Sequence, residues 1–414
     1  MVRRGANQPS VRGYNQALVL DRVRRSGGLS RVELAASTGL SAQTVSNITQ
    51  RLLEAGIIEE AGRTLPGDRQ QAGPGKPRTL LRLVTSSRYA VGVHLDPSLL
   101  TIVLLSIDGT VVARRSRPTP SASDPNRTVR LITKEIELLL ATADVDREPI
   151  VGIGIAAPGP IDAERGIIVD PPNLGGWHRV PLRDAVAERT GFPVVLDKDV
   201  TAAAVAERWM DAAGTATSFA FLYLGTGLGM GLVVDDEVVR GGSGNAGEIG
   251  HIVVDPSGPT CVCGQRGCIA VSCTPASLVE EAEALGILPA TRVGNDPRTI
   301  DDAFSALVDL AAAEHAGALT VLERGGERIT RALAVVCNLL DVDRVIVGGP
   351  LWARLSPWFE RQVPDALADL LVTRSVRRVT VTGTNAGDDV GAIGAACLAL
   401  DEALTPRPAS LLLD

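Results

Sequence analysis

The chain has 414 residues, of which 45% are apolar and only 3% aromatic, so its core must consist mainly of Ala, Val, Leu and Ile. This apolar content excludes a largely disordered chain, and the lack of any run of about 18 apolar residues argues against a membrane span. The net charge of −7 is unevenly spread: residues 1–90 carry 14 Lys and Arg against 6 Asp and Glu, whereas the rest carries 27 against 42. We therefore expect only the basic N-terminal part to meet a polyanion, although a solvated Arg-rich surface would have the same composition.

Three helices are predicted within the first 56 residues. Apolar residues recur with helical spacing up to about residue 26. Ser30 and Glu33 form a capping box, which predicts the start of a second helix that Gly39 ends. Ser41 is the expected N-cap of a third helix. Two short helices joined around a glycine are typical of a helix-turn-helix, although an ordinary helical hairpin shares this pattern.

The third helix has small polar side chains on its early turns, as a helix that reads the major groove of DNA requires. Two short strands follow, one starting near Ile58 and one over 78–84, with a Gly/Pro/Arg-rich loop between them. This pattern predicts a wing, and a flexible linker is the alternative. We expect a winged helix-turn-helix domain over residues 1–84. The residues expected to contact DNA are Ser41, Gln43, Thr44, Ser46, Asn47, Arg51, Lys76 and Arg78.

From about residue 85 strands alternate with helices, which predicts an α/β architecture. The stretch LGTGLGMG places glycines at 225, 227, 229 and 231 directly after an apolar strand. Such a loop lets backbone N–H groups approach a phosphate, but a tight β-turn would also explain it. It is neither a Walker loop nor a dinucleotide-binding fingerprint, because a strand rather than a helix follows.

Four of the six cysteines and one of the four histidines lie within residues 250–273. A disulfide knot, a metal site and a catalytic centre are all compatible with this clustering. The first residues lack the apolar stretch of a signal peptide, so we expect a cytoplasmic protein, in which disulfides are rare. This favours a metal site.

Seven segments in this order resemble the ROK family of repressors, open reading frames and sugar kinases, and the helix-turn-helix in front extends the resemblance to its repressor branch. The segments are GIGIAAPGPID, PPNLGGW, VVLDKDVTAAAVAE, LGTGLGMG, GNAGEIGHIVVD, CVCGQRGCIA and VIVGGPL. The resemblance implies the two-lobed, actin-like (ribonuclease H-like) ATPase fold of sugar kinases, with ligand in the cleft between the lobes. It places this domain at 85–405, with lobe 1 at about 85–200 plus a C-terminal helix at 385–405, and lobe 2 at about 201–384.

The resemblance also implies the site residues. His251, Cys261, Cys263 and Cys268 fall on the family's zinc ligands, in a knuckle over 251–268, and thiolates with an imidazole suit structural Zn²⁺. The remaining cysteines, Cys273, Cys337 and Cys397, are expected to pack in the core. The expected ligand-binding residues are Asn173, Lys198, Asp199, Glu248 and His251, and the expected phosphate loop is formed by Gly225, Thr226, Gly227 and Gly229.

Three departures from the family pattern argue against kinase activity. The first hairpin has Pro97 where a glycine-containing phosphate loop is expected, Lys198 replaces an asparagine, and Ala270 replaces a glutamate. Asp199 occupies the position of the catalytic base, which we expect to be vestigial. The added cation and lost carboxylate suggest an anionic effector bound by Lys198. Pairing of Lys198 with Asp197 or Glu248 in a vestigial pocket is the alternative.

We therefore expect a DNA-binding repressor of carbohydrate-related genes that senses a sugar or sugar derivative, acting as a homodimer or homotetramer on an operator. An active ATP-dependent sugar kinase that keeps a DNA-binding head is the second hypothesis. A regulator controlled by a partner protein is the third.

Overall fold

The structure is a computed structural model that describes residues 8–63, 78–120, 124–172, 174–211, 217–290 and 297–404. Its N-terminal part contains three helices and a three-stranded sheet of order β1-β3-β2. The helices are α1 (Gln8–Ser26), α2 (Arg31–Thr38) and α3 (Ala42–Glu54), and the strands are β1 (Leu29–Ser30), β2 (Ile58–Arg63) and β3 (Thr79–Leu83). The three predicted helices and the two strands of the predicted wing are thus confirmed.

Local capping explains where these helices begin and end. The Ser30 hydroxyl accepts the backbone N–H of Glu33, and the Glu33 carboxylate accepts the backbone N–H of Ser30, which completes the predicted capping box. Gly39 ends α2 in the left-handed conformation with φ of 70°. The Ser41 hydroxyl accepts the N–H of Thr44 and caps α3. The turn between α2 and α3 is therefore fixed by its own residues.

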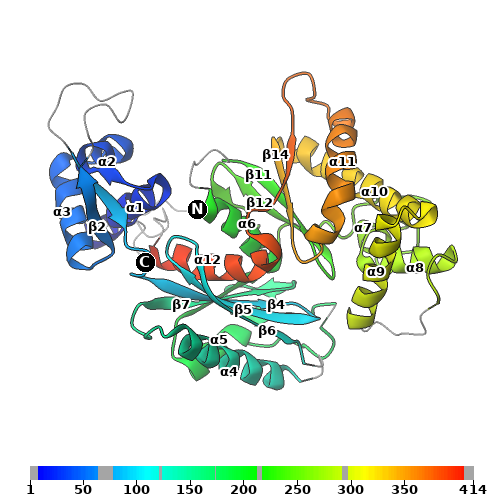
Figure 1. The fold of residues 1–414 in the computed structure, drawn as a ribbon, viewed down its shortest axis with the longest axis horizontal. Coiled ribbons are helices and arrows are strands. Elements are labelled where there is room, and N and C mark those ends of the chain that lie inside the picture. The colour runs from blue at the N-terminus through cyan, green and yellow to red at the C-terminus, as the bar shows by residue number, and fades with distance from the viewer. Residues whose placement is uncertain are drawn as a thin grey trace.

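After the N-terminal part, the described chain contains two five-stranded sheets that have the same topology (Figure 1). In each, three consecutive antiparallel strands are followed by two parallel strands on the other side of the first one. The first sheet consists of β4 (Tyr89–Leu95), β5 (Leu99–Ser106), β6 (Val111–Pro118), β7 (Ile150–Ala157) and β10 (Val194–Lys198). The second consists of β11 (Phe219–Leu224), β12 (Leu228–Val234), β13 (Glu237–Val238), β14 (Arg344–Gly348) and β15 (Thr380–Gly383).

Two buried helices, α6 (Asp199–Met210) and α12 (Val390–Leu404), lie between the two sheets (Figure 1). Glycines in the strands let them approach closely. A methyl group on Gly154 of the first sheet would lie 1.7 Å from the carbonyl oxygen of Ala395 in α12, and one on Gly231 of the second sheet would lie 2.2 Å from that of Val200 in α6. Both sheets therefore contact this helix pair through backbone atoms.

The outer faces of the sheets carry the remaining helices. α4 (Pro125–Ala143) and α5 (Leu182–Thr190) pack on the first sheet in one apolar cluster. The second sheet is covered in part by α8 (Pro275–Ala284), α9 (Pro297–Ala312), α10 (Ala316–Leu340) and α11 (Trp352–Leu370). Four short elements complete the described chain: β8 (Ile161–Asp162), β9 (Ile167–Ile168), α7 (Ile269–Ser272) and the 3-10 turn at Gly387–Asp389. Among the described helices none is by itself both long and apolar enough to cross a membrane; α9 and α10 reach that length and composition only as a pair bent by 110°.

Candidate functional site

The exposed face of α3 presents the residues predicted to meet DNA. Gln43, Asn47 and Arg51 are exposed and lie one helical turn apart. The Gln43 amide donates to the Asn47 side chain at 3.0 Å, and Arg51 Nε donates to the Asn47 carbonyl at 3.4 Å. The opposite face, with Val45, Ile48 and Leu52, is buried. α3 therefore offers a continuous polar row while its other side fixes it to the domain.

The other predicted DNA contacts lie around this row. Ser41 is exposed at the N-terminus of α3, with its hydroxyl 2.8 Å from that of Thr44, and Ser46 is half-buried. Arg78 is exposed immediately before β3, whereas Lys76 lies outside the described residues. These described residues, which are predicted to contact DNA, thus lie at the start of α3 and beside the strands that follow it.

Asp199 is the first residue of α6, directly after β10. Its carboxylate accepts the N–H of Val200 at 2.7 Å. Burial raises the pKa of Asp199 to about 7, and the negative charges of Asp96 and Glu248 act in the same direction. A carboxyl group with this pKa can accept or release a proton near neutral pH.

Lys198, the N-cap of α6, is buried and already has a partner. Its ammonium group forms an ion pair with Glu248 and donates to the carbonyl oxygen of Ala246 at 3.2 Å. The neighbouring Asp197 carboxylate instead pairs with Arg240 at 2.8 Å. Asp197 and Glu248 were the two carboxylates expected to pair with Lys198, and the structure shows the ion pair with Glu248.

The 158–160 loop lies beside this ion pair. A methyl group on Gly159 would be 3.0 Å from the Lys198 side chain and 3.2 Å from the Glu248 carboxylate, so the 158–160 loop packs directly against both. Ala270, where the resemblance leads one to expect a glutamate, donates its backbone N–H to the carbonyl of Gly250 at 3.0 Å. Asn173 lies outside the described residues.

The glycine-rich loop combines a turn with helix packing. Gly225 donates its N–H to the carbonyl of Gly227 at 3.0 Å, and the hydroxyl of Thr226 donates to the Asp96 carboxylate at 3.1 Å. Gly229 and Gly231 face α6, because a methyl group on either would lie within 2.6 Å of Val200. The second pair of glycines is thus required for helix packing, a role that the sequence pattern did not indicate.

His251 and three cysteines form a compact cluster of metal-ligand type. One ligand atom from each of His251, Cys261, Cys263 and Cys268 lies within 4.8 Å of the others. His251 Nδ1 is 3.4 Å from the Cys261 sulfur, and the sulfurs of Cys263 and Cys268 are 3.6 Å apart. Ligands of a tetrahedral zinc ion with bonds of about 2.3 Å lie about 3.8 Å from each other, so this donor set fits such a metal.

The loop that carries the cluster needs glycine at two positions. Gly264 and Gly267 have φ of 87° and 65°, and a methyl group on Gly267 would lie 1.4 Å from the carbonyl oxygen of Asp255.

All six cysteines of the sequence lie in the described residues and none is in a disulfide, while the three predicted core cysteines are buried as expected.

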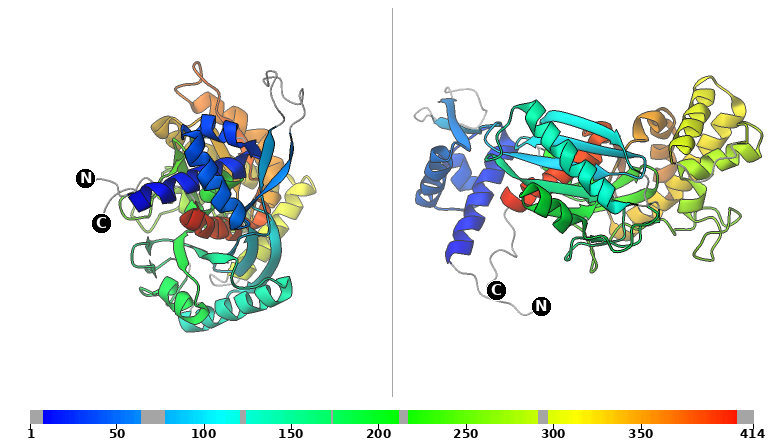
Figure 2. Two further views of the ribbon diagram at one scale, coloured as in Figure 1. Left: turned by 90° about the vertical axis from the view of Figure 1, so that its left-hand side faces the viewer. Right: turned by 90° about the horizontal axis from the view of Figure 1, so that it is seen from below.

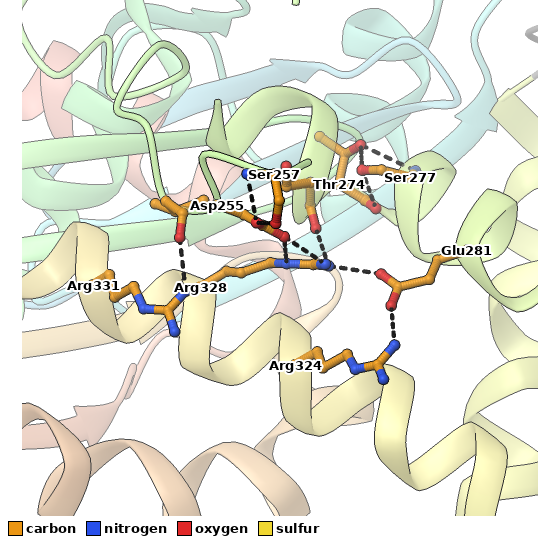
Figure 3. A network of polar contacts seen from close by, with 10 residues as sticks. Asp255, Ser257, Thr274, Ser277, Glu281, Arg324, Arg328 and Arg331 are labelled. Carbon is orange, nitrogen blue, oxygen red and sulfur yellow. Dashed lines mark hydrogen bonds and ion pairs between the residues drawn. The ribbon is translucent and has the colours of Figure 1, made fainter. Parts of the chain in front are cut away.

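An arginine network that sequence reasoning missed supports this loop (Figure 3). Arg328 of α10 donates to Asp255 at 3.0 Å and to Glu281 of α8 at 2.6 Å. Arg331 donates to the carbonyl oxygen of Val254 at 2.8 Å, and Arg324 pairs with Glu281 at 3.1 Å. Hydrogen bonds from Ser257 and Arg328 lower the pKa of Asp255, so the carboxylate stays ionised. The segment between His251 and Cys261 is thereby tied to two helices.

A solved structure with similar architecture extends over almost the whole chain. It is described as the crystal structure of a ROK family transcriptional regulator, a homologue of the E. coli MLC protein. It aligns with 95% of this chain and 98% of its own, with a TM-score of 0.75 and 22% identity. The likeness confirms the predicted fold, a winged helix-turn-helix followed by the two-lobed fold of ROK proteins.

Sequence relatives include both a repressor and a sugar kinase. The xylose repressor of Bacillus subtilis is 25% identical over 342 residues, 83% of each chain. The glucokinase of Thermotoga maritima is 31% identical over 312 residues, 74% of this chain and 96% of that enzyme. The alignment with the xylose repressor of Caldicellulosiruptor bescii, 28% identical, covers 64% of this chain and 64% of that protein.

Family models assign both parts of the chain. Residues 13–71 match the MarR family model, which agrees with the winged helix described above. Residues 91–402 match the model of the ROK family, which is about three quarters of the chain. The predicted family is thus confirmed: the chain belongs to the ROK family.

Proposed function

We propose that the chain is a DNA-binding transcriptional repressor of carbohydrate-related genes that senses a sugar or sugar derivative between its lobes. The exposed row of Gln43, Asn47 and Arg51 on the helix of a winged domain carries the proposal. The similarity to a xylose repressor over 83% of the chain supports it. The protein would act in the cytoplasm, where its operator DNA lies.

Chromosomal mapping of binding sites, followed by anisotropy titration of the fragments found, tests this function. In this proposal Asn47 bonds a base edge and Arg51 a base edge or a phosphate, so Asn47→Ala should weaken binding to the mapped site by roughly tenfold. Glu54→Gln, at the far end of the same helix, is the matched control and should leave the Kd within about twofold. A purified protein that retains no chromosomal DNA would refute the proposal.

The contacts of the first hairpin turn favour sensing over phosphoryl transfer. Asp96 already accepts hydrogen bonds from Thr226 and from Ser98, and Pro97 has no N–H to offer a phosphate. Asp199 and the similarity to a glucokinase favour the second candidate, a sugar kinase. In a coupled ADP-release assay we expect no sugar-dependent turnover. Turnover that Asp199→Asn abolishes would establish the kinase instead.

Whether the effector is anionic or neutral can be tested at Lys198. Because Lys198 is paired with Glu248, an anionic effector would have to replace the Glu248 carboxylate as its partner. Calorimetric titration with neutral and phosphorylated sugars distinguishes the two classes. An anionic effector should bind at least about tenfold more weakly to Lys198→Ala, whereas tight binding of a neutral hexose to both proteins would exclude the anionic class.

We further propose that the His251, Cys261, Cys263 and Cys268 cluster holds a structural Zn²⁺. Four protein ligands leave no open position for water, so the ion would stabilise the loop rather than take part in chemistry. Atomic absorption should find about one zinc per chain, lost together with loop order after chelation. A fully folded protein purified without metal would contradict this assignment.

Operator recognition also implies a symmetric oligomer, and we propose a homodimer or homotetramer, because two winged helices must reach two half-sites. Sedimentation equilibrium measures the number of chains. Control by a partner protein is the remaining alternative; a protein recovered from lysate that changes operator affinity when no sugar does so would favour it.

A further inference from the structure

Helix α6 extends from the predicted ligand-binding residues Lys198 and Asp199 to the N-terminal domain. Its N-terminal end carries Asp199, preceded by the N-cap Lys198 that pairs with Glu248. Its twelve residues extend about 18 Å at 1.5 Å per residue. Near its C-terminal end, Trp209 lies against α1 of the N-terminal domain. One element therefore contacts both places that an effector-responsive regulator must couple.

The packing of α6 leaves little room for it to deform. Nearly all its residues are buried, and a methyl group on Gly394 of α12 would lie 2.1 Å from the carbonyl oxygen of Ala202. Near the other end, Arg208 forms an ion pair with Asp401 of α12. Since backbone touches backbone, side-chain rotations cannot absorb a displacement, and α6 and α12 must move together.

Arg24 of α1 joins the N-terminal domain to the end of α6. Its guanidinium group stacks 3.9 Å from the centre of the Trp209 ring and also donates to the Trp209 carbonyl oxygen. Asp21 accepts from the same guanidinium at 2.7 Å and from Arg25. The Arg24 side chain is only 7% exposed. This contact is therefore a stacked, hydrogen-bonded and largely buried junction.

Apolar residues surround the junction and extend it to α3. Leu20, Ile107 and Leu404 line the space around Trp209 and Arg24, and Figure 2 shows α1 beside the C-terminal end of α12. Val19 and Val23, on the same helix as Arg24, belong to the buried core that holds α3. The orientation of α3 thus follows that of α1.

We propose that α6 transmits the state of the ligand pocket to the DNA-binding domain through the contact between Arg24 and Trp209. This inference rests on the proposed function and specifies how it is regulated. An effector that changes the partner of Lys198 displaces the first turn of α6, and the displacement reaches α1 through the Trp209 ring and carbonyl. Operator affinity and effector affinity are then linked through one contact.

A double-mutant cycle on operator affinity tests the coupling with no need to know the effector. The operator fragment comes from chromosomal mapping with the wild-type protein, and its Kd is measured by anisotropy for four full-length chains: wild type, Lys198→Met, Arg24→Gln and the double variant. We expect Lys198→Met to change the Kd by roughly fivefold or more when Arg24 is present and by less than about twofold when it is absent. Arg22→Gln, at an exposed position of the same helix, should leave the full effect of Lys198→Met intact.

The outcomes separate the two proposals. An equal change of the Kd in both backgrounds, or no change on Lys198→Met at all, overturns the coupling through Arg24. A wild-type protein that binds no chromosomal DNA refutes the proposed function itself. Circular dichroism monitors folding, and if Arg24→Gln does not fold, Arg24→Lys takes its place, because it keeps the charge beside Asp21 while removing the planar stacking group. Arg24→Lys should then reduce the effect of Lys198→Met, and an undiminished effect would count against the coupling.

Discussion

The two five-stranded sheets share one topology, yet the first hairpin turn in each is built differently. In the first sheet the turn between β4 and β5 consists of Asp96, Pro97 and Ser98, and the Asp96 carboxylate accepts the N–H of Ser98 at 2.8 Å. In the second, the turn between β11 and β12 is closed by the backbone, and its Thr226 donates to that same carboxylate. The proline-containing turn therefore binds its counterpart in the other sheet. A phosphate entering between them would have to displace protein hydrogen bonds.

The largest effect is expected at the glycines through which both sheets contact the helix pair α6 and α12. Gly154→Ala and Gly231→Ala each place a methyl group about 2 Å from a helix carbonyl, so both should lower the free energy of unfolding by about 3 kcal/mol or more. Gly242→Ala is the control, because no atom lies within 4 Å of its added methyl group. Urea denaturation measures all three. If Gly231→Ala behaves like the control, the two sheets do not pack on the helix pair in the same way.

A second test uses the cluster containing Cys268, which among the described residues has no counterpart on the side of the first sheet. Cys268→Ser, or chelation of the wild type, should cost about 2 kcal/mol or more and lower the Tm by at least several degrees. Hydrogen exchange should accelerate over residues 250–270 and in α8 but not in β4 and β7. Equal acceleration in both halves would show that the cluster supports the whole fold instead.

A third test concerns Asp199, whose pKa the Asp96 carboxylate of the first turn helps to raise. Its folded-state pKa of about 7 lies above its unfolded value of 3.8, so the folded chain binds the proton more tightly. Stability contributed by this proton is present below about pH 4 and is lost as the pH rises to about 7. Asp199→Asn should remove this loss, on the order of 2–3 kcal/mol between pH 5 and 8. Denaturation at both pH values measures it, with the exposed Asp302→Asn as control; an unchanged pH profile in Asp199→Asn would contradict the raised pKa.

The smallest effect is expected from the hydrogen bond that joins the turns. Thr226→Val removes its donor while keeping the side-chain shape, and should cost about 1 kcal/mol. Ser98→Ala removes a hydroxyl that bonds the same carboxylate within the first turn only. Hydrogen exchange should accelerate in both turns for Thr226→Val but only near residue 98 for Ser98→Ala. An identical response to the two changes would mean that the turns are not coupled.

Structural features that depend on residues close together in the chain could be predicted from the sequence. The capping box of Ser30 and Glu33, the cap at Ser41 and the order of strands and helices depend on local spacing, and all are found in the structure. The proximity of His251 to the three cysteines followed from a family motif within 18 residues, and their ligand atoms do lie together.

Contacts between distant parts of the chain were not accessible in the same way. Arg24 and Trp209 are 185 residues apart, and nothing in either local pattern indicates the other. The partner of Lys198 was left open between Asp197 and Glu248, because both are carboxylates and only the fold decides which is near. The shared topology of the two sheets was also missed, since it is a repeat of strand order and not of residues.

Ile107 carries a practical lesson for protein engineering. It belongs to the turn after β5 of the first sheet, yet it is fully buried in the apolar core of the N-terminal domain. The N-terminal domain by itself therefore lacks one side chain of its own apolar core. A chimera that joins residues 1–84 to a different C-terminal domain would have a cavity at the position of the Ile107 side chain. Such a chimera must therefore include the 106–110 turn or contain another side chain of similar volume at that place.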